Sequence, residues 1–143
     1  MSLKQFESLP KDATFPLDEL IANLKTDANG LIAAIAQQHD TGEVLMLAYM
    51  NATSIKETLT TGHVCYWSRS RQTYWRKGES SGHQQKLISM AFDCDGDCLL
   101  LQVDQTGPAC HTNRRNCFFF EINAGQVVIN SAPMADKTRP ATK

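Results

Sequence analysis

The stretch LIAAIAQQHDTGEVLMLAYM, residues 31–50, decides the fold of the N-terminal half of the chain. It contains two apolar runs, 31–37 and 43–50, separated by a polar segment in which Asp40 and Gly42 favour a turn. Short apolar runs bounded by turn residues are typical of β-strands. The sequence therefore predicts a β-hairpin here.

Two short helices are expected on either side of this hairpin. Residues 16–25 (PLDELIANLK) place leucine and isoleucine at helical spacing, and Pro16 suits a first helical turn. A second helix is expected to start after Asn51, which can cap it, and to run to about Thr60 before Gly62 ends it.

The rest of the chain is rich in segments with the composition and turn boundaries of strands. These segments are 63–70, 73–77, 84–93, 98–104, 117–122 and 126–131. Together with the two short helices they predict a strand-rich α+β fold. We expect one domain over residues 1–143, with a core from about 16 to 131 and a loose polar tail over 132–143.

Composition and charge narrow the functional classes. The 143 residues carry a formal net charge of -1, so the surface as a whole is not expected to bind polyanions. No apolar run is long enough for a membrane span, and MSLKQFESLPKD lacks the apolar stretch of a signal peptide. We therefore expect a cytoplasmic protein with reduced thiols, in which five cysteines indicate metal binding or chemistry rather than disulfides.

The acidic segment FDCDGDCLL, residues 92–100, is the sharpest chemical feature. Asp93, Asp95 and Asp97 alternate, so on an extended backbone they lie on one face. Clustered carboxylates suit Mg²⁺, although a solvated acidic turn is an equally simple interpretation. An EF-hand loop is excluded, because Cys98 stands where such a loop starting at Asp93 requires glycine.

Cysteines supply a second candidate metal site. Cys94, Cys110 and Cys117 would give three thiolates, which suits a catalytic zinc ion with its fourth position open. Cys98 follows directly into an apolar run and is interpreted as a core residue, with a role as fourth ligand left open. Cys65 lies inside a hydrophobic strand and is expected to be buried.

A basic and aromatic stretch, residues 66–86, is a candidate phosphate-binding region. Arginine binds phosphate through paired hydrogen bonds, and backbone N–H groups of the loop GESSGH (78–83) could line an anion. A solvated, charged sheet edge is the simpler alternative. The candidate substrate-binding residues are Arg69, Arg71, Arg76 and Lys77.

Several of these segments together resemble the signature blocks of the phosphoribosyl-AMP cyclohydrolase family. The blocks are GEVLMLAYMN (42–51), WSRSR (67–71), WRKGESSGHQQ (75–85), DCDGD (93–97) and GPACHTNRRNCF (107–118). The last block departs slightly from the family pattern, with Asn113 where glycine is frequent and Asn116 where serine is frequent. The spacing between Cys110 and Cys117 is kept.

The resemblance implies hydrolytic opening of the N1–C6 bond in the adenine ring of 1-(5-phosphoribosyl)-AMP, the third step of histidine biosynthesis. It further implies zinc and magnesium as cofactors and an intertwined homodimer. The zinc site would be shared across the interface, with Cys94 from one chain and Cys110 and Cys117 from the other. Magnesium would be held by the three aspartates of DCDGD.

Elementary chemistry is compatible with this activity. N1-alkylated adenine is an electron-poor amidine, so zinc-bound hydroxide can add at C6, and the tetrahedral centre then expels N1 once a proton is supplied. His111 follows Cys110 and is the candidate for proton transfer, whereas a loop histidine alone is more often exposed. The basic stretch would bind the two phosphate groups of the substrate.

Three rival functions are compatible with parts of the sequence, and one of them is a structural zinc protein without activity, which a closed fourth ligand at Cys98 would support. A zinc nucleobase deaminase would require HxE and PCxxC motifs, which the chain lacks. A zinc-stabilised RNA-binding module could use the arginine and aromatic stretch, but it predicts a basic domain, whereas this chain has a pI of about 6.4. We therefore expect a small-molecule nucleotide substrate, with no nucleic acid or membrane partner.

Overall fold

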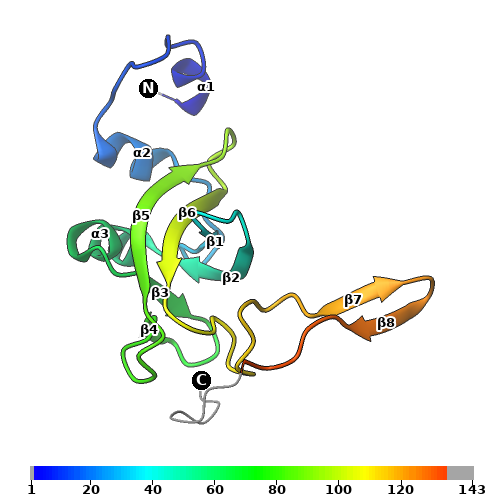
Figure 1. Ribbon diagram of the computed structural model, residues 1–143. Helices are drawn as coiled ribbons and strands as arrows, with labels where there is room; N and C mark the ends of the chain where they lie inside the picture. The colour runs from blue at the N-terminus through cyan, green and yellow to red at the C-terminus, as the bar shows by residue number, and fades with distance from the viewer. Residues whose placement is uncertain (1, 135–143) are drawn as a thin grey trace.

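The hairpin expected from residues 31–50 lies at the centre of a six-stranded sheet (Figure 1). A computed structural model describes residues 2–134. In it, β1 (Ile32–Gln38) and β2 (Val44–Met50) pair antiparallel, with Ile35 opposite Leu47. The alternation of buried and half-buried residues along β1 matches a strand with one face on the core.

The remaining strands of this sheet are β3 (Cys65–Ser68), β4 (Thr73–Arg76), β5 (Gln85–Phe92) and β6 (Cys98–Gln105), in the order β4-β3-β2-β1-β6-β5. Neighbouring strands run antiparallel except β1 and β6, which are parallel. A parallel pair requires a long crossover, and here the chain between β2 and β6 supplies it. The strand segments predicted from the sequence are confirmed.

A second, two-stranded hairpin projects from the body of the molecule (Figure 1). It consists of β7 (Phe120–Asn123) and β8 (Gln126–Ile129), and every residue of both strands is exposed. Ala124 and Gly125 both adopt positive φ, the geometry of the tight turn that matches strand twist. An isolated two-stranded hairpin is marginally stable in water, so this one is expected to need a covering surface.

Residues 2–134 form three helices, where the sequence indicated two. α2 (Leu17–Asn23) and α3 (Ala52–Thr61) are the predicted helices, and α3 has Asn51 as its N-cap and Gly62, at φ 77°, as its C-cap. α1 (Leu3–Phe6) was missed because four residues are too few to show a helical period. It is stabilised by a capping box between Ser2 and Gln5.

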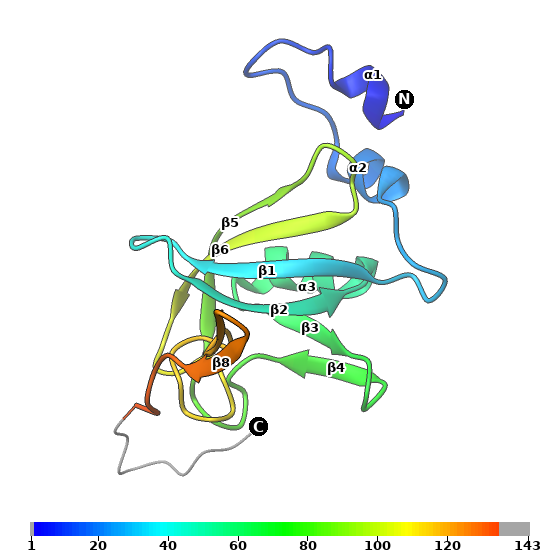
Figure 2. The same cartoon turned by 90° about the vertical axis from the view of Figure 1, so that its right-hand side faces the viewer.

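The core lies between the sheet and the two longer helices. α3 contacts β2 and β3, and Figure 2 shows it behind the central strands. α2 packs beside it, since side chains of α2, α3 and β6 line one apolar crevice. The hydrophobic members of the core include Ile32, Leu45, Met50, Ile55, Val64, Tyr66, Leu99, Leu101 and Val103.

The opposite face of the sheet is open and apolar. Leu47, Ile35 and Leu100 lie side by side on three adjacent strands, as their pairing registers require. Leu47 is 47% exposed and Leu100 is 37% exposed. No helix within residues 2–134 is long and apolar enough to cross a membrane. Residues 135–143, most of the predicted loose tail, lie outside the described part of the chain.

Candidate active site

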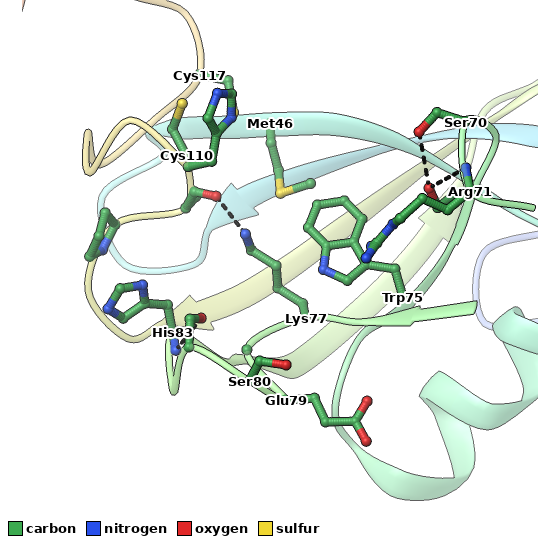
Figure 3. A pocket seen from close by; sticks show the side chains of 16 residues that line it. Met46, Ser70, Arg71, Trp75, Lys77, Glu79, Ser80, His83, Cys110 and Cys117 are labelled. Carbon is green, nitrogen blue, oxygen red and sulfur yellow. Dashed lines mark hydrogen bonds between the residues drawn. The ribbon is translucent and has the colours of Figure 1, made fainter. Parts of the chain in front are cut away.

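A cavity of about 430 Å³ opens at the end of the sheet where β4 and β6 finish (Figure 3). Its walls come from β2, β3 and β4, from the loop between β3 and β4, from the loop that follows β4 and from the loop between β6 and β7. Apart from β2, these are segments that the sequence analysis selected separately, as a basic stretch and as a cysteine-bearing loop. The fold therefore joins two of the predicted chemical features in one pocket.

The loop GESSGH turns tightly and forms the rim of the pocket. Gly78 adopts φ +83°, and a Cβ there would lie 2.4 Å from the backbone nitrogen of Gln84. The Gly82 N–H donates to the Gly78 carbonyl at 2.8 Å, and the His83 N–H donates to Ser81 Oγ at 3.1 Å. Only glycine fits the first position, so the sequence determines this turn. Ser80, Ser81 and His83 face the pocket as a result.

The loop between β6 and β7 is held in place by Arg115. Its Nη1 donates to the carbonyls of Gln105 and Gly107, both at 2.9 Å, and its Nη2 donates to Gln38 Oε1 at 2.8 Å. Its Nε lies 3.5 Å from Glu43 Oε1. A guanidinium has five donors in a fixed fork, which suits this gathering of carbonyls. Sequence reasoning missed Arg115, and the only available signal was an arginine pair in an otherwise irregular loop.

Cys110 and Cys117 come together on one wall of the pocket (Figure 3). Burial and the neighbouring Cys110 thiol together raise the pKa of the Cys117 thiol to about 11, although Lys77 opposes the shift. Thr112 Oγ1 donates to Cys110 Sγ at 3.1 Å. Two adjacent thiols beside a cation are a suitable donor set for zinc, which would favour their deprotonated forms.

The two histidines of the pocket are His111 and His83. His111, the predicted proton-transfer residue, lies beside the Cys110 thiol in sequence and on the same pocket wall. His83 was not selected from the sequence. It is buried, and the Cβ of an alanine at Gly107 would lie 3.1 Å from its ring. Close packing against a glycine fixes the position of this imidazole.

The structure separates the four predicted phosphate-binding residues. Arg71 and Lys77 line the pocket, and Lys77 Nζ donates to the Ala109 carbonyl at 2.5 Å. Burial lowers the pKa of Lys77. Arg69 instead lies over the ring of Tyr49, 3.9 Å from its centroid.

Arg76 is not brought into the pocket. It makes a paired ion contact with Glu57 of α3, at 2.8 and 2.9 Å. The cause is strand alternation, because Trp75 and Lys77 lie on the pocket side while Arg76 between them lies on the other.

The predicted magnesium ligands meet at the opposite end of the sheet. Carboxylate oxygens of Asp93, Asp95 and Asp97 lie within 4.8 Å of one another, and the three residues are exposed. The side-chain hydrogen bond between Asp93 and Asp97 raises the pKa of Asp97 and lowers that of Asp93. Asp93 Oδ1 also accepts the Asp97 N–H at 2.9 Å. Among residues 2–134 this is the only cluster of three such ligands.

Cys94 lies in the same turn and is exposed. The eight residues of β6 separate this turn from the pocket, roughly 25 Å at the usual rise of a strand. A single chain therefore does not bring Cys94 to Cys110 and Cys117. Cys98 is half-buried at the same distant end, opposite Ala33 of β1, and Cys65 is buried in the core as predicted.

Comparison with known proteins identifies the family. Residues 46–119 match the family model described as phosphoribosyl-AMP cyclohydrolase. A phosphoribosyl-AMP cyclohydrolase of Paracoccus denitrificans is 66% identical over 112 residues, which cover 78% of this chain and 93% of that protein. Phosphoribosyl-AMP cyclohydrolase 2 of Pseudomonas fluorescens is 55% identical over 136 residues, 95% of this chain and 92% of the relative.

A third relative, the phosphoribosyl-AMP cyclohydrolase of Alcanivorax borkumensis, is 56% identical over 133 residues, 93% of this chain and 94% of the relative. The matched region includes the glycine-rich rim, the acidic turn and the two pocket cysteines. Identity at this level over nearly the whole length shows common ancestry and a shared fold. This chain belongs to the phosphoribosyl-AMP cyclohydrolase family.

Proposed function

We propose that the chain hydrolyses the N1–C6 bond of the adenine ring in 1-(5-phosphoribosyl)-AMP, a step of histidine biosynthesis, in the cytoplasm. The observation that carries the proposal is the pocket itself, in which two thiols, His111 and Arg71 line one cavity. Family membership supports the choice of substrate. The RNA-binding alternative loses its main support, because the basic residues of β4 and its flanks face different directions.

We propose further that the active unit is a homodimer. Cys94 lies at the far end of the sheet from Cys110 and Cys117, so a three-thiolate site requires a second chain. In a twofold dimer each subunit would give Cys94 to one site and the other two cysteines to the second. Two such composite sites would form in each dimer.

Two apolar surfaces support this assembly. One is the open sheet face with Leu47, Ile35 and Leu100, and the other is the projecting β7–β8 hairpin, where Ile122 is 81% exposed. Contiguous exposed apolar patches mark interaction sites in soluble proteins. An intertwined arrangement, with the hairpin lying against the partner subunit, would cover both.

The donor chemistry matches the proposed metals. When bound by the three thiolates, zinc would supply water activated for attack at neutral pH. The oxygen cluster of the acidic turn suits a hard cation such as magnesium. Both metals would lie at the same composite site if the acidic turn of one subunit meets the pocket of the other.

The residues of the chain would then orient the substrate and move protons. Arg71 can bind a phosphate group through paired hydrogen bonds, with Ser70 beside it and Ser80 on the GESSGH loop as further neutral donors. His111, which lines the cavity with Cys110, would accept a proton from the attacking water or donate one to the departing N1. Trp75 forms an apolar wall that restricts water access.

Turnover of phosphoribosyl-AMP followed by absorbance tests the function. Activity should disappear on chelation and return with zinc plus magnesium. No turnover by metal-loaded protein would refute the proposal.

Complementation tests the shared site. Cys94→Ala and Cys110→Ala should each be inactive as homodimers. Their co-expressed heterodimer would contain one intact site, so a random mixture should recover about a quarter of wild-type activity. Failure of the mixture to recover activity would refute a site shared between subunits.

A further inference from the structure

Lys77 occupies an unusual place for a phosphate-binding lysine. Its side chain crosses the face of Trp75, with Nζ 4.9 Å from the ring centroid, and ends on the Ala109 carbonyl at 2.5 Å (Figure 3). Its backbone N–H donates to the Val64 carbonyl at 3.0 Å, so the start of the side chain is anchored to the sheet. The ammonium group is therefore directed at the loop that carries Cys110.

The surroundings of the Lys77 ammonium are chemically specific. Within residues 2–134 no carboxylate forms an ion pair with it, and the thiols of Cys110 and Cys117 line the same cavity. Arg71, by contrast, lies on the other side of the Trp75 ring in the close view of the pocket (Figure 3). Lys77 and Arg71 therefore lie against different walls of the pocket.

We propose that Lys77 is a positioning residue of the thiolate centre rather than a phosphate ligand. Its hydrogen bond fixes the peptide directly before Cys110, and its charge offsets the negative charge of a zinc ion bound to three thiolates. This inference rests on the proposed zinc site.

Two physical effects give Lys77 this role. Zn²⁺ with three thiolates carries a net charge of -1, and a nearby cation in a partly buried pocket stabilises that charge more strongly than it would in bulk water. Hydrogen bonds just outside the ligands orient them, and their loss typically reduces metal affinity by about 10- to 100-fold. A phosphate ligand would instead affect substrate affinity and leave zinc affinity unchanged.

The test measures zinc affinity of the purified full-length protein by competition with a chromophoric chelator. Lys77→Met keeps the length of the side chain but removes its charge and its donor, and we expect zinc to bind about 10- to 100-fold more weakly. Lys77→Arg keeps both and should recover most of the affinity. Lys86→Met is the matched control, because Lys86 is exposed on β5 and does not line the pocket.

Zinc affinity equal to wild type in Lys77→Met, together with a raised KM for phosphoribosyl-AMP, would overturn the inference in favour of a phosphate ligand. If Lys77→Met does not fold, Lys77→Gln keeps a donor without charge, and unchanged zinc affinity in that variant would equally overturn the charge argument. Cys110→Ala distinguishes failure of the Lys77 inference from failure of the proposed zinc site. If it binds zinc as well as wild type does, the proposed zinc site itself is wrong.

Discussion

The two ends of the six-stranded sheet differ in how completely one chain builds them. At the thiol end, Arg115 and Lys77 fix the loop of Cys110 through backbone carbonyls, and the pocket is enclosed on several sides. At the aspartate end, Asp93, Asp95 and Asp97 are exposed on a turn. One end is a preorganised site, and the other presents ligands that face outward.

The two ends of the sheet also differ in the metal ligands that they offer. In an isolated subunit, the outward-facing carboxylates and the exposed Cys94 face solvent. They offer the oxygen ligands and the third thiol that the pocket lacks. In the proposed homodimer, a second copy would bring the exposed turn of one subunit to the pocket of the other. The strongest tests therefore compare substitutions at the two ends.

Removal of Cys94 should have the largest effect. We expect Cys94→Ala to reduce kcat/KM by at least about 10³-fold, as much as Cys110→Ala at the other end, because loss of a zinc ligand exceeds the 10²- to 10³-fold cost of one oxyanion donor. Steady-state turnover and bound zinc measured on both variants check this. Cys98→Ala is the matched control from the same end, and an equal loss there would identify Cys98 as a ligand.

Glycines at the two ends should differ in their contribution to stability. Gly78→Ala places a methyl group 2.4 Å from the Gln84 backbone at φ +83°, and we expect a loss of about 3–4 kcal/mol. Gly96→Ala, at φ +70°, meets the end of the Leu3 side chain, which can move, so about 1–2 kcal/mol is expected. Chemical unfolding of both variants measures the difference. Equal losses would show that the rim of the pocket is not rigid.

The sequence predicted the local elements well, because their signals are local. The turn between β1 and β2, the cap at Asn51 and the stop at Gly62 all follow from residue types at fixed offsets. The parallel pairing of β1 with β6 joins residues more than 60 positions apart, and no local pattern specifies it. α1 was missed because it is a single turn.

The candidate site was predictable in its residues but not in its geometry. Cys110 and Cys117 were selected as thiolate ligands and His111 for its place beside Cys110, and all three line the pocket. Arg115 was missed because its partners are main-chain carbonyls, which have no sequence signature. Arg76 was grouped with Lys77 by proximity, although strand alternation places adjacent residues on opposite faces.

The smallest effect on activity is expected at Arg76, the neighbour of Lys77 in the chain. It tests whether the site at the thiol end includes only the pocket-facing side of β4. Arg76 contacts Glu57 and not the pocket, so Arg76→Gln should leave kcat/KM within about twofold of wild type. The hydrogen bond from Arg76 lowers the pKa of Glu57 below its ordinary 4.5. The pair therefore contributes stability above that pH, and the contribution is lost as the pH falls through the lowered value.

Thermal unfolding of wild type and Arg76→Gln at pH 7 and at decreasing pH checks the direction of this pH dependence of stability. The small difference in Tm at neutral pH should shrink as Glu57 becomes protonated, and Glu57→Gln should behave in the same way. Arg76 is exposed and Glu57 is partly exposed, so screening by water keeps the effect small. A large loss of turnover in Arg76→Gln would instead mean that this side of β4 contributes to the site, and the division between pocket-facing Lys77 and helix-facing Arg76 would be wrong.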